Sequence, residues 1–351
     1  MSDTISQYLE DLERRINPEV EDHVLAQWKG FWNRSVAEGY FAPTRVPAPS
    51  TLEWPKININ DAILDRSFEL MLLRELCGVN AVLSGGSGVT MQIRTNFGTT
   101  ILPSLFGVEV MLMDRGMDTL PGAHPLPGGA AAIERLLTAG VPPHRAGQGA
   151  AVFDCAQFYL ETLAHYPKLQ KYCRIYHPDA QGSLDICEVV WGSDLFLALH
   201  DTPDLVKRFL GLITDTYISF IDRWFELVRP KDDFNVHYGW IHPGKVRLSL
   251  DSCMNVSPDA YQEFVRPCDE RLLNRYGGIV HSCGKVDHFV PLLAGIKGYH
   301  AFNLSQPHYN DMETIYRNTV DKGVFILGLD RGTADRAVTE GRKLHGMVMC
   351  S

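Results

Sequence analysis

Residues 278–284 read Gly-Ile-Val-His-Ser-Cys-Gly, a short apolar run that ends in His281 and Cys283 and closes on Gly284. A continuous apolar run of this length, bounded by glycine, is typical of a strand buried on both faces in a parallel sheet. The final glycine permits a tight turn directly after the strand. Because reactive groups in α/β enzymes lie where strands end and loops begin, the stretch predicts a buried strand with functional residues at its carboxyl end.

Apolar runs of the same kind recur through the second half of the chain. A long helix is expected from Asp201 to Glu226, with Pro203 in its first turn. The expected strands lie at residues 235–238 or 246–251, then at 278–281, 299–304, 324–327 and 347–350. Their spacing of roughly 20 to 45 residues suits βα units. We therefore expect an α/β fold, and the regular units favour a closed (β/α)8 TIM barrel over an open doubly wound sheet, which periodicity alone does not exclude.

The N-terminal part has a different pattern. Apolar residues recur at helical spacing from Ile5 to Ile16, and Pro18 then breaks the pattern, so two short helices are expected there. The Pro-rich passage that follows is too apolar for a disordered linker and is expected to lie extended on the domain. We expect residues 1–60 to form an N-terminal helical extension with this Pro-rich segment, and residues 61–351 to form the barrel.

Composition argues against several classes of partner. The 351 residues carry a formal net charge of −9 with no run of Lys or Arg, so nucleic acid is not an expected partner. The N-terminus lacks a secretory signal pattern and no window approaches about 18 uninterrupted apolar residues, so we expect a cytoplasmic protein without a membrane segment. The eight cysteines form no CxxC pair, which in a reducing compartment means free thiols. Gly-Gly-Ser-Gly at 85–88 lacks the spacing and the lysine of a nucleotide-binding loop.

His281 and Cys283 form the first candidate site. Residues i and i+2 of a strand point the same way, so this imidazole and thiolate can share one metal ion, and zinc suits the pair. Zinc needs a further ligand, and Cys350, which ends the last expected strand, could reach the same end of a closed barrel. The alternative is that His281 only hydrogen-bonds a neighbour while Cys283 packs as a small apolar residue.

A second polar cluster lies between residues 235 and 251. His237 is the side chain type most easily poised near neutral pH, and Asp251 ends an expected strand, so both are candidates for catalytic proton transfer. Tyr238 is a candidate for substrate binding. His242 stands beside a Pro-Gly pair and is expected to be an ordinary loop residue.

Two further residues are candidates for substrate binding. Gln181 lies in the polar segment 177–182, which could supply hydrogen bonds to a substrate or could equally be a surface turn. Arg94 could bind a substrate carboxylate through two hydrogen bonds, and its alternative is a structural salt bridge.

Together these motifs resemble the uroporphyrinogen decarboxylase superfamily, which also includes corrinoid-dependent methyltransferases. The resemblance runs from about residue 97 to the end, and the order and spacing of several short motifs carry it. They are Asn-Phe-Gly at 96–98, Leu-Phe-Gly at 105–107, Gln-Gly-Ser-Leu-Asp at 181–185, Trp-Gly-Ser at 191–193, Asp-Thr-Pro at 201–203, Asp251 with Val-Ser-Pro-Asp-Ala-Tyr at 256–261, and His-Ser-Cys-Gly at 281–284. The resemblance implies a (β/α)8 barrel.

The branch of this superfamily is indicated by what the chain has and lacks. True uroporphyrinogen decarboxylases share an N-terminal segment of the form MRQAGRY that handles many carboxylates, and this chain has no such segment. The methyltransferase branch carries zinc on an HxC pair and a distant cysteine, which implies His281, Cys283 and Cys350 as ligands here. Where zinc-dependent relatives often place an acidic ligand, this chain has Asn303 and Gln306. Asn303 is assigned to substrate binding, and whether Gln306 replaces the acidic ligand stays open.

The resemblance therefore implies a methyltransferase that moves a methyl group between a corrinoid, carried by a partner protein, or a methylated small molecule, and a zinc-activated thiol. A metal-free carboxy-lyase acting on another substrate, with His281 and Asp251 as acid and base, is the first alternative. A non-catalytic barrel that binds a corrinoid or tetrapyrrole is the second. Family members often form homodimers. The chain stops one residue after Cys350, so either the N-terminal helices cover the place of the final barrel helix or the sequence is truncated.

Overall fold

The second half of the chain forms a parallel sheet. The computed structural model describes residues 3–350. The strand order is β11-β10-β9-β8-β7, and every neighbouring pair is parallel. The strands are β7 (Val246–Ser249), β8 (Gly278–Ser282), β9 (Tyr299–Leu304), β10 (Phe325–Leu329) and β11 (Val348–Cys350). Every residue of β7, β8 and β11 is buried. Burial on both faces explains why β8 begins with, and β11 consists of, apolar residues.

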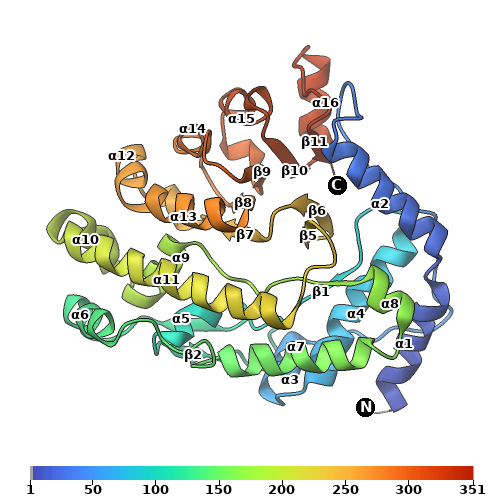
Figure 1. Cartoon of the computed structure of the whole chain (residues 1–351), viewed down its shortest axis with the longest axis horizontal. Coiled ribbons are helices and arrows are strands. Elements are labelled where there is room, and N and C mark those ends of the chain that lie inside the picture. Colours follow the sequence, from blue (N-terminus) through green and yellow to red (C-terminus); the bar gives the residue numbers. More distant parts are fainter. Residues whose placement is uncertain (1–2, 351) are drawn as a thin grey trace.

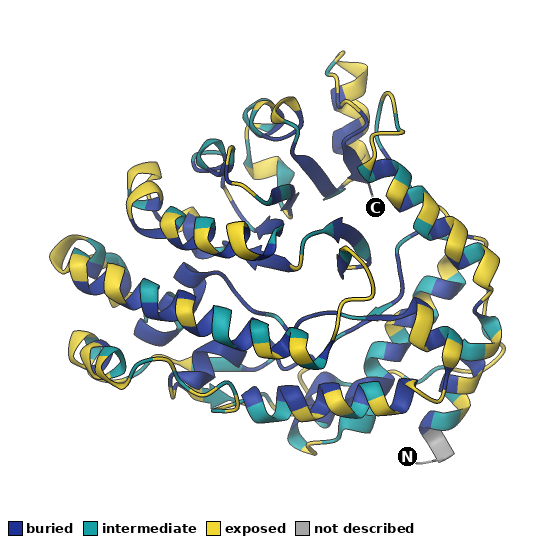
Figure 2. Cartoon of the chain, in the orientation of Figure 1, coloured by how far each residue is buried: buried dark blue, intermediate teal, exposed yellow. Residues whose placement is uncertain are grey.

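Helices lie outside these strands (Figure 1). Three of them precede β7 in the chain, namely α9 (Ser183–Trp191), α10 (Asp194–Asp201) and α11 (Pro203–Leu227). The others connect one strand of the sheet to the next, namely α12 (Pro258–Ala260), α13 (Arg266–Tyr276), α14 (Val290–Leu293), α15 (Met312–Asn318) and α16 (Arg331–Thr339). Figure 2 shows buried strands at the centre and exposed residues on the outer faces of the helices. The long helix expected after Asp201 is confirmed, because α11 begins with Pro203 at its first position and buries one side of its surface.

The first half of the chain is mostly helical. Its helices are α3 (Ile59–Leu64), α4 (Phe68–Gly85), α5 (Ile101–Leu105), α6 (Gly129–Ala139), α7 (Gly149–Leu163) and α8 (Pro167–Tyr172). Its strands are short: β1 (Gln92–Ile93) pairs in parallel with β4 (Arg174–Ile175), and β2 (Glu109–Met111) pairs antiparallel with β3 (Gly122–His124). The regular βα alternation expected from residue 61 is therefore clear only in the second half.

Backbone contacts join the first half to both edges of the parallel sheet. At the β7 edge, the Gly182 N–H donates to the Ser249 carbonyl over 2.8 Å. At the β11 edge, the Phe41 N–H donates to the Val348 carbonyl over 2.7 Å, and the Cys350 N–H donates to the Phe41 carbonyl over 2.9 Å. Segments from the first half thus continue the hydrogen bonding beyond each edge strand.

The two N-terminal helices expected from the sequence are confirmed as α1 (Asp3–Arg15) and α2 (Pro18–Trp32). The side chain of Asn17 accepts a hydrogen bond from the Glu19 N–H, which caps α2. Phe31 of α2 is fully buried and its ring lies 4.9 Å from that of Phe325 in β10. Helix α2 therefore packs directly on the parallel sheet, and both N-terminal helices contribute to one hydrophobic core with it.

A hairpin lies next to the sheet. Strand β5 (Phe234–His237) pairs antiparallel with β6 (Trp240–Pro243), and Tyr238 and Gly239 form the two-residue turn. Both turn residues have positive φ, 54° and 80°, which matches the turn type that suits the twist of a hairpin. The sequence offered residues 235–238 and 246–251 as alternatives for one strand. Both form strands, and only the second belongs to the parallel sheet.

The architecture is mixed α and β with a five-stranded parallel sheet, which confirms the expected α/β class. The expected strands at 278–281, 299–304, 324–327 and 347–350 correspond to β8, β9, β10 and β11. Among residues 3–350, no helix combines the length and apolar character that crossing a membrane requires.

Candidate metal centre and neighbouring polar clusters

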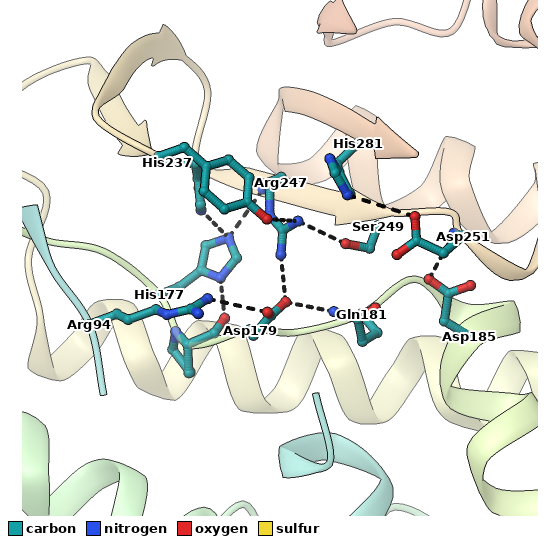
Figure 3. Close-up of polar contacts among 12 residues, drawn as sticks. Arg94, His177, Asp179, Gln181, Asp185, His237, Arg247, Ser249, Asp251 and His281 are labelled. Atoms are coloured by element: carbon teal, nitrogen blue, oxygen red, sulfur yellow. Dashed lines mark hydrogen bonds and ion pairs between the residues drawn. The ribbon is translucent and has the colours of Figure 1, made fainter. Parts of the chain in front are cut away.

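Three side chains meet at one end of the parallel sheet. Ligand atoms of Asp251, His281 and Cys283 all lie within 4.8 Å of one another. The Nε2 atom of His281 lies 3.7 Å from Oδ1 of Asp251 and 3.5 Å from Sγ of Cys283; Figure 3 shows His281 and Asp251 facing each other. Carboxylate, imidazole and thiolate are the ligand types that zinc uses in proteins. We call these three residues the metal group, and their chemistry fits a zinc ion.

The register of β7 and β8 explains why the metal group forms. Ser249 pairs with His281 across the two parallel strands, so the residues that follow each strand leave the sheet side by side. The Cys283 N–H donates to Oδ1 of Asp251 over 2.7 Å. Asp251 therefore holds the turn that carries Cys283 and presents the same carboxylate to His281.

Asn303 fixes the proton of His281. The Nδ2 group of Asn303 donates to the Leu327 carbonyl over 2.8 Å, which leaves its Oδ1 to accept from Nδ1 of His281 over 2.6 Å. The neutral imidazole then carries its proton on Nδ1, and its Nε2 lone pair faces the metal group. Burial lowers the pKa of His281, and Arg247 acts in the same direction, so the neutral form that a metal requires is favoured.

Cys283 is in an environment that suits a cation. Burial raises the pKa of its thiol, and the carboxylate of Asp251 raises the pKa further. A thiolate beside a carboxylate is unfavourable unless positive charge lies next to both. A zinc ion supplies that charge and deprotonates a coordinating thiol.

Asp185 of α9 hydrogen-bonds to the backbone of the turn that carries Asp251. Its carboxylate accepts the Asp251 N–H over 3.2 Å and the Ser252 N–H over 2.7 Å. Burial raises the pKa of Asp185 to about 8, and the nearby charge of Asp251 adds to the effect. These two hydrogen bonds hold the turn after β7 in the conformation that directs Asp251 toward His281.

Cys350 was expected to be the third ligand. Within residues 3–350, its thiol does not lie with the ligand atoms of the metal group. It ends β11, which is separated from β8 by β9 and β10. The charges that act on its thiol belong to Arg331, Asp330 and Asp335, at or just before the start of α16. The structure instead brings Asp251, which was expected to transfer protons, to His281 and Cys283, because neighbouring parallel strands deliver their end residues to one place.

The two expected residues on the 303–306 strand end have other partners. Oε1 of Gln306 accepts the Gly284 N–H over 2.5 Å, so this oxygen holds the turn after β8. Asn303, expected to bind substrate, is buried and uses its amide to orient His281. The carboxylate absent from this strand end is found instead at Asp251, which follows β7 on the other side of β8.

Asp179 gathers the two other expected substrate-binding residues. Its Oδ2 accepts from Nη1 of Arg94 over 3.2 Å, and its Oδ1 accepts from Nε2 of Gln181 over 2.6 Å (Figure 3). Arg247 of β7 donates to the same Oδ1 atom. The side chains of Asp179, Arg94 and Arg247 are 11%, 14% and 3% exposed, so this is a buried ion-pair cluster. The salt bridge that was the alternative for Arg94 is therefore observed. The alternative for Gln181, a surface turn, is wrong, because Gln181 is buried and donates to Asp179.

Tyr238 and Ser249 offer hydroxyl groups beside the metal group. Nη1 of Arg247 donates to the Tyr238 hydroxyl over 2.7 Å and to the Ser249 hydroxyl over 2.8 Å. Each oxygen thus acts as an acceptor and retains its own proton to donate. Within the described part of the chain, neither of these hydroxyl protons is donated to an acceptor. The Tyr238 ring lies 5.9 Å from the ring of His281, so Tyr238 remains placed to contact a substrate.

Three histidines form a buried chain on the other side of Arg247. Nε2 of His237 lies 2.9 Å from Nε2 of His177, and Nδ1 of His237 lies 2.7 Å from Nε2 of His242. Nδ1 of His177 contacts the Pro178 carbonyl at 2.7 Å, and Nδ1 of His242 contacts the Pro243 carbonyl at 2.9 Å. We call these three residues the histidine chain. All are at most 1% exposed.

The histidine chain alters two expectations. His237 was expected to be catalytic, but both of its ring nitrogens contact other histidines, so any contribution to chemistry is indirect. His242 was expected to be a loop residue and is instead fully buried in β6. The Arg247 N–H also donates to His177 over 3.1 Å, which ties the chain to β7.

Several residues of the site could not be chosen from the sequence. Arg247, Ser249 and Asp185 all contact or flank the metal group or its neighbours, yet none was assigned a role from the sequence, although Asp185 ends one of the motifs that carry the resemblance. Alternation on β7 is the one usable signal, since Arg247 and Ser249 lie two residues apart on an otherwise apolar strand. Neither a scan against models of protein families nor a search of curated proteins finds a match to this chain.

Proposed function

We propose that this chain is a zinc-dependent methyltransferase that moves a methyl group from a corrinoid, carried by a partner protein, to a thiol substrate. The observation that carries the proposal is the metal group, with the Nε2 lone pair of His281 directed at Asp251 and Cys283. Three protein ligands leave the fourth tetrahedral position for a substrate. A zinc ion bound there would keep a thiolate nucleophilic near neutral pH.

We further propose that the fold is a closed (β/α)8 barrel, with the metal group at the carboxyl ends of its strands. Hydrogen bonds beyond both sheet edges support this closure. The segment around residue 41, which bonds to β11, also bonds to Gly88 just before β1, where Gly88 N–H donates to the Pro43 carbonyl over 2.9 Å. β1 pairs with β4, and Gly182 beyond β4 returns to Ser249 of β7. These contacts, with the stretches of chain that connect them, lead from one edge of the sheet to the other and support the proposed closure.

In the proposed reaction the substrate thiol would release its proton to solvent on binding, and its sulfur would then accept the methyl group from the corrinoid. A sulfur–carbon bond would form as the cobalt–carbon bond breaks, and the corrinoid would keep the electron pair of the broken bond. Within this chain, Asp251, His281 and Cys283 would hold the metal that keeps the thiol deprotonated. The free hydroxyl protons of Tyr238 and Ser249 suit an acceptor group on the substrate, such as a carboxylate, bound a short distance from its thiol.

Metal analysis tests the proposal directly. Purified protein should contain about one zinc per chain and transfer the methyl group of free methylcobalamin to a carboxylate-bearing thiol. Cys283→Ala should lose both the metal and the transfer, whereas Cys77→Ala, a thiol outside the metal group, should keep both. Wild-type protein that stays metal-free after growth and dialysis with zinc would refute the proposal.

The short distance between His281 and Asp251 favours one second candidate. With Nε2 and Oδ1 only 3.7 Å apart, the two residues could serve as acid and base of a metal-free carboxy-lyase. The two functions separate under chelation. Turnover of a carboxylated substrate that survives exhaustive removal of metal would favour the lyase, and its loss would favour the zinc enzyme.

A further inference from the structure

The histidine chain contains more hydrogen-bond positions than three neutral imidazoles can fill. Two ring nitrogens face backbone carbonyls, at Pro178 and Pro243, and carbonyls only accept. Two further contacts join ring nitrogens to ring nitrogens, and each needs one proton between the two atoms. The four contacts therefore require four N–H protons. Three neutral histidines supply three, because each carries one.

The fourth proton can be assigned to one nitrogen only when the histidine chain carries a positive charge. If His177 and His242 donate to their carbonyls, their Nε2 atoms are lone pairs, and His237 must then donate from both nitrogens. His237 is a cation in that arrangement. In the neutral state one contact has no proton, so either two lone pairs face each other or a carbonyl faces a lone pair. A single added proton removes this conflict and no further contact remains for a second one.

The surroundings decide at which pH the proton binds. Arg247, Arg94 and Arg174 oppose it, Asp179 favours it, and His300 lies near His242. Burial is the largest effect and lowers the pKa of His177 to about 4 and of His242 to about 3, so the chain is neutral at neutral pH. Completion of the four contacts works against this burial penalty.

We propose that His177, His237 and His242 act as one proton-binding unit, which takes up a single shared proton as the pH falls and thereby fastens the β5–β6 hairpin to β7. The three residues lie on three different segments, and His177 also accepts the Arg247 N–H of β7. Tyr238 directly follows His237 and bonds to Arg247. The three histidines are thus positioning residues for Tyr238, and the inference does not depend on a metal.

Imidazole nitrogen spectra of ¹⁵N-histidine-labelled protein, recorded from pH 8 downward to acid unfolding, test the proposal. Ring signals of all three histidines should shift together in one step with the uptake of one proton. The protection factors of the β5–β6 hairpin amides, which are exchange rates corrected for the intrinsic effect of pH, should be higher below that step than above it. Three separate steps, or no step before unfolding, would overturn the proposal.

His242→Gln is the decisive variant. A glutamine amide can donate to Nδ1 of His237 without any added proton, so the remaining contacts are filled by neutral side chains. The variant should fold, and His177 and His237 should keep fixed neutral tautomers with no shared step. His300→Gln is the matched control, since it removes a neighbouring half-buried histidine outside the chain and should leave the step unchanged. If His242→Gln fails to fold, the number of protonation steps in the wild-type protein still decides between one shared proton and separate titrations.

Discussion

The metal group and the histidine chain lie on either side of Arg247, and both depend on buried imidazoles, but their hydrogen bonding differs. One ring nitrogen of His281 hydrogen-bonds to Asn303, and the other faces Asp251 and Cys283. Both ring nitrogens of His237 contact ring nitrogens of other histidines. A buried histidine with one nitrogen left over can serve as a metal ligand, whereas one with both nitrogens engaged by protein groups is not available as a ligand. The partners, and not the residue type, decide which role is available.

The largest expected effect separates the two sites by metal binding. Asp251→Asn should lower the affinity for zinc by more than about 100-fold, because it removes the charge of a direct ligand. His237→Gln should leave zinc binding unchanged. Equilibrium zinc titration with a competing chelator measures both. Cys350→Ala should resemble wild type, and loss of zinc in that variant would restore Cys350 as a ligand in place of Asp251.

The ion-pair cluster between the two sites should dominate stability. Asp179→Asn leaves Arg94 and Arg247 buried without their shared carboxylate and should lower the free energy of unfolding by about 3–5 kcal/mol, measured in urea. Asp215→Asn is the control, because its pair with Arg271 is about half exposed. That change should cost less than about 1 kcal/mol. Equal losses in the two variants would contradict the assignment of Asp179 as the centre of the cluster.

The orienting role of Asn303 should appear as an intermediate effect on zinc. Asn303→Leu keeps a similar volume but removes the acceptor for Nδ1 of His281, and should weaken zinc binding about 10- to 100-fold. Asn303→Asp should retain strong binding, since a carboxylate accepts the same hydrogen bond. Identical zinc affinity in wild type and Asn303→Leu would show that the metal group does not need this partner.

The smallest expected effect is the response of stability to pH. Well above the ordinary histidine pKa of 6.5, these three residues are neutral in both the folded and the unfolded state. As the pH falls, the unfolded chain binds three protons on these residues and the folded chain at most one, so the free energy of unfolding decreases. Each proton of difference contributes a slope of up to ~1.4 kcal/mol per pH unit. In wild type the slope should become shallower by one proton where the histidine chain charges, and His242→Gln should lack that change.

The sequence predicted the second half of the fold well because buried parallel strands and the helix after Asp201 have strong local signals. The first half was harder, since β1 and β4 have two residues each and are specified by contacts distant in the chain. The site divides in the same way. His281 and Cys283 share one strand end and were identified together, whereas Asp251 joins them only through the register of β7 and β8. Local patterns do not encode that register.

The turn at Tyr238 has a consequence for how this chain tolerates change. Its geometry, with two positive φ angles, is the one that Asn-Gly forms most readily, yet a tyrosine occupies the first position. An asparagine there would ease the backbone and remove the phenol from beside His281. Selection for thermal robustness alone would therefore drive this position toward asparagine. If this position stayed tyrosine under such selection, the contribution of the phenol to activity would outweigh the stability gained with asparagine.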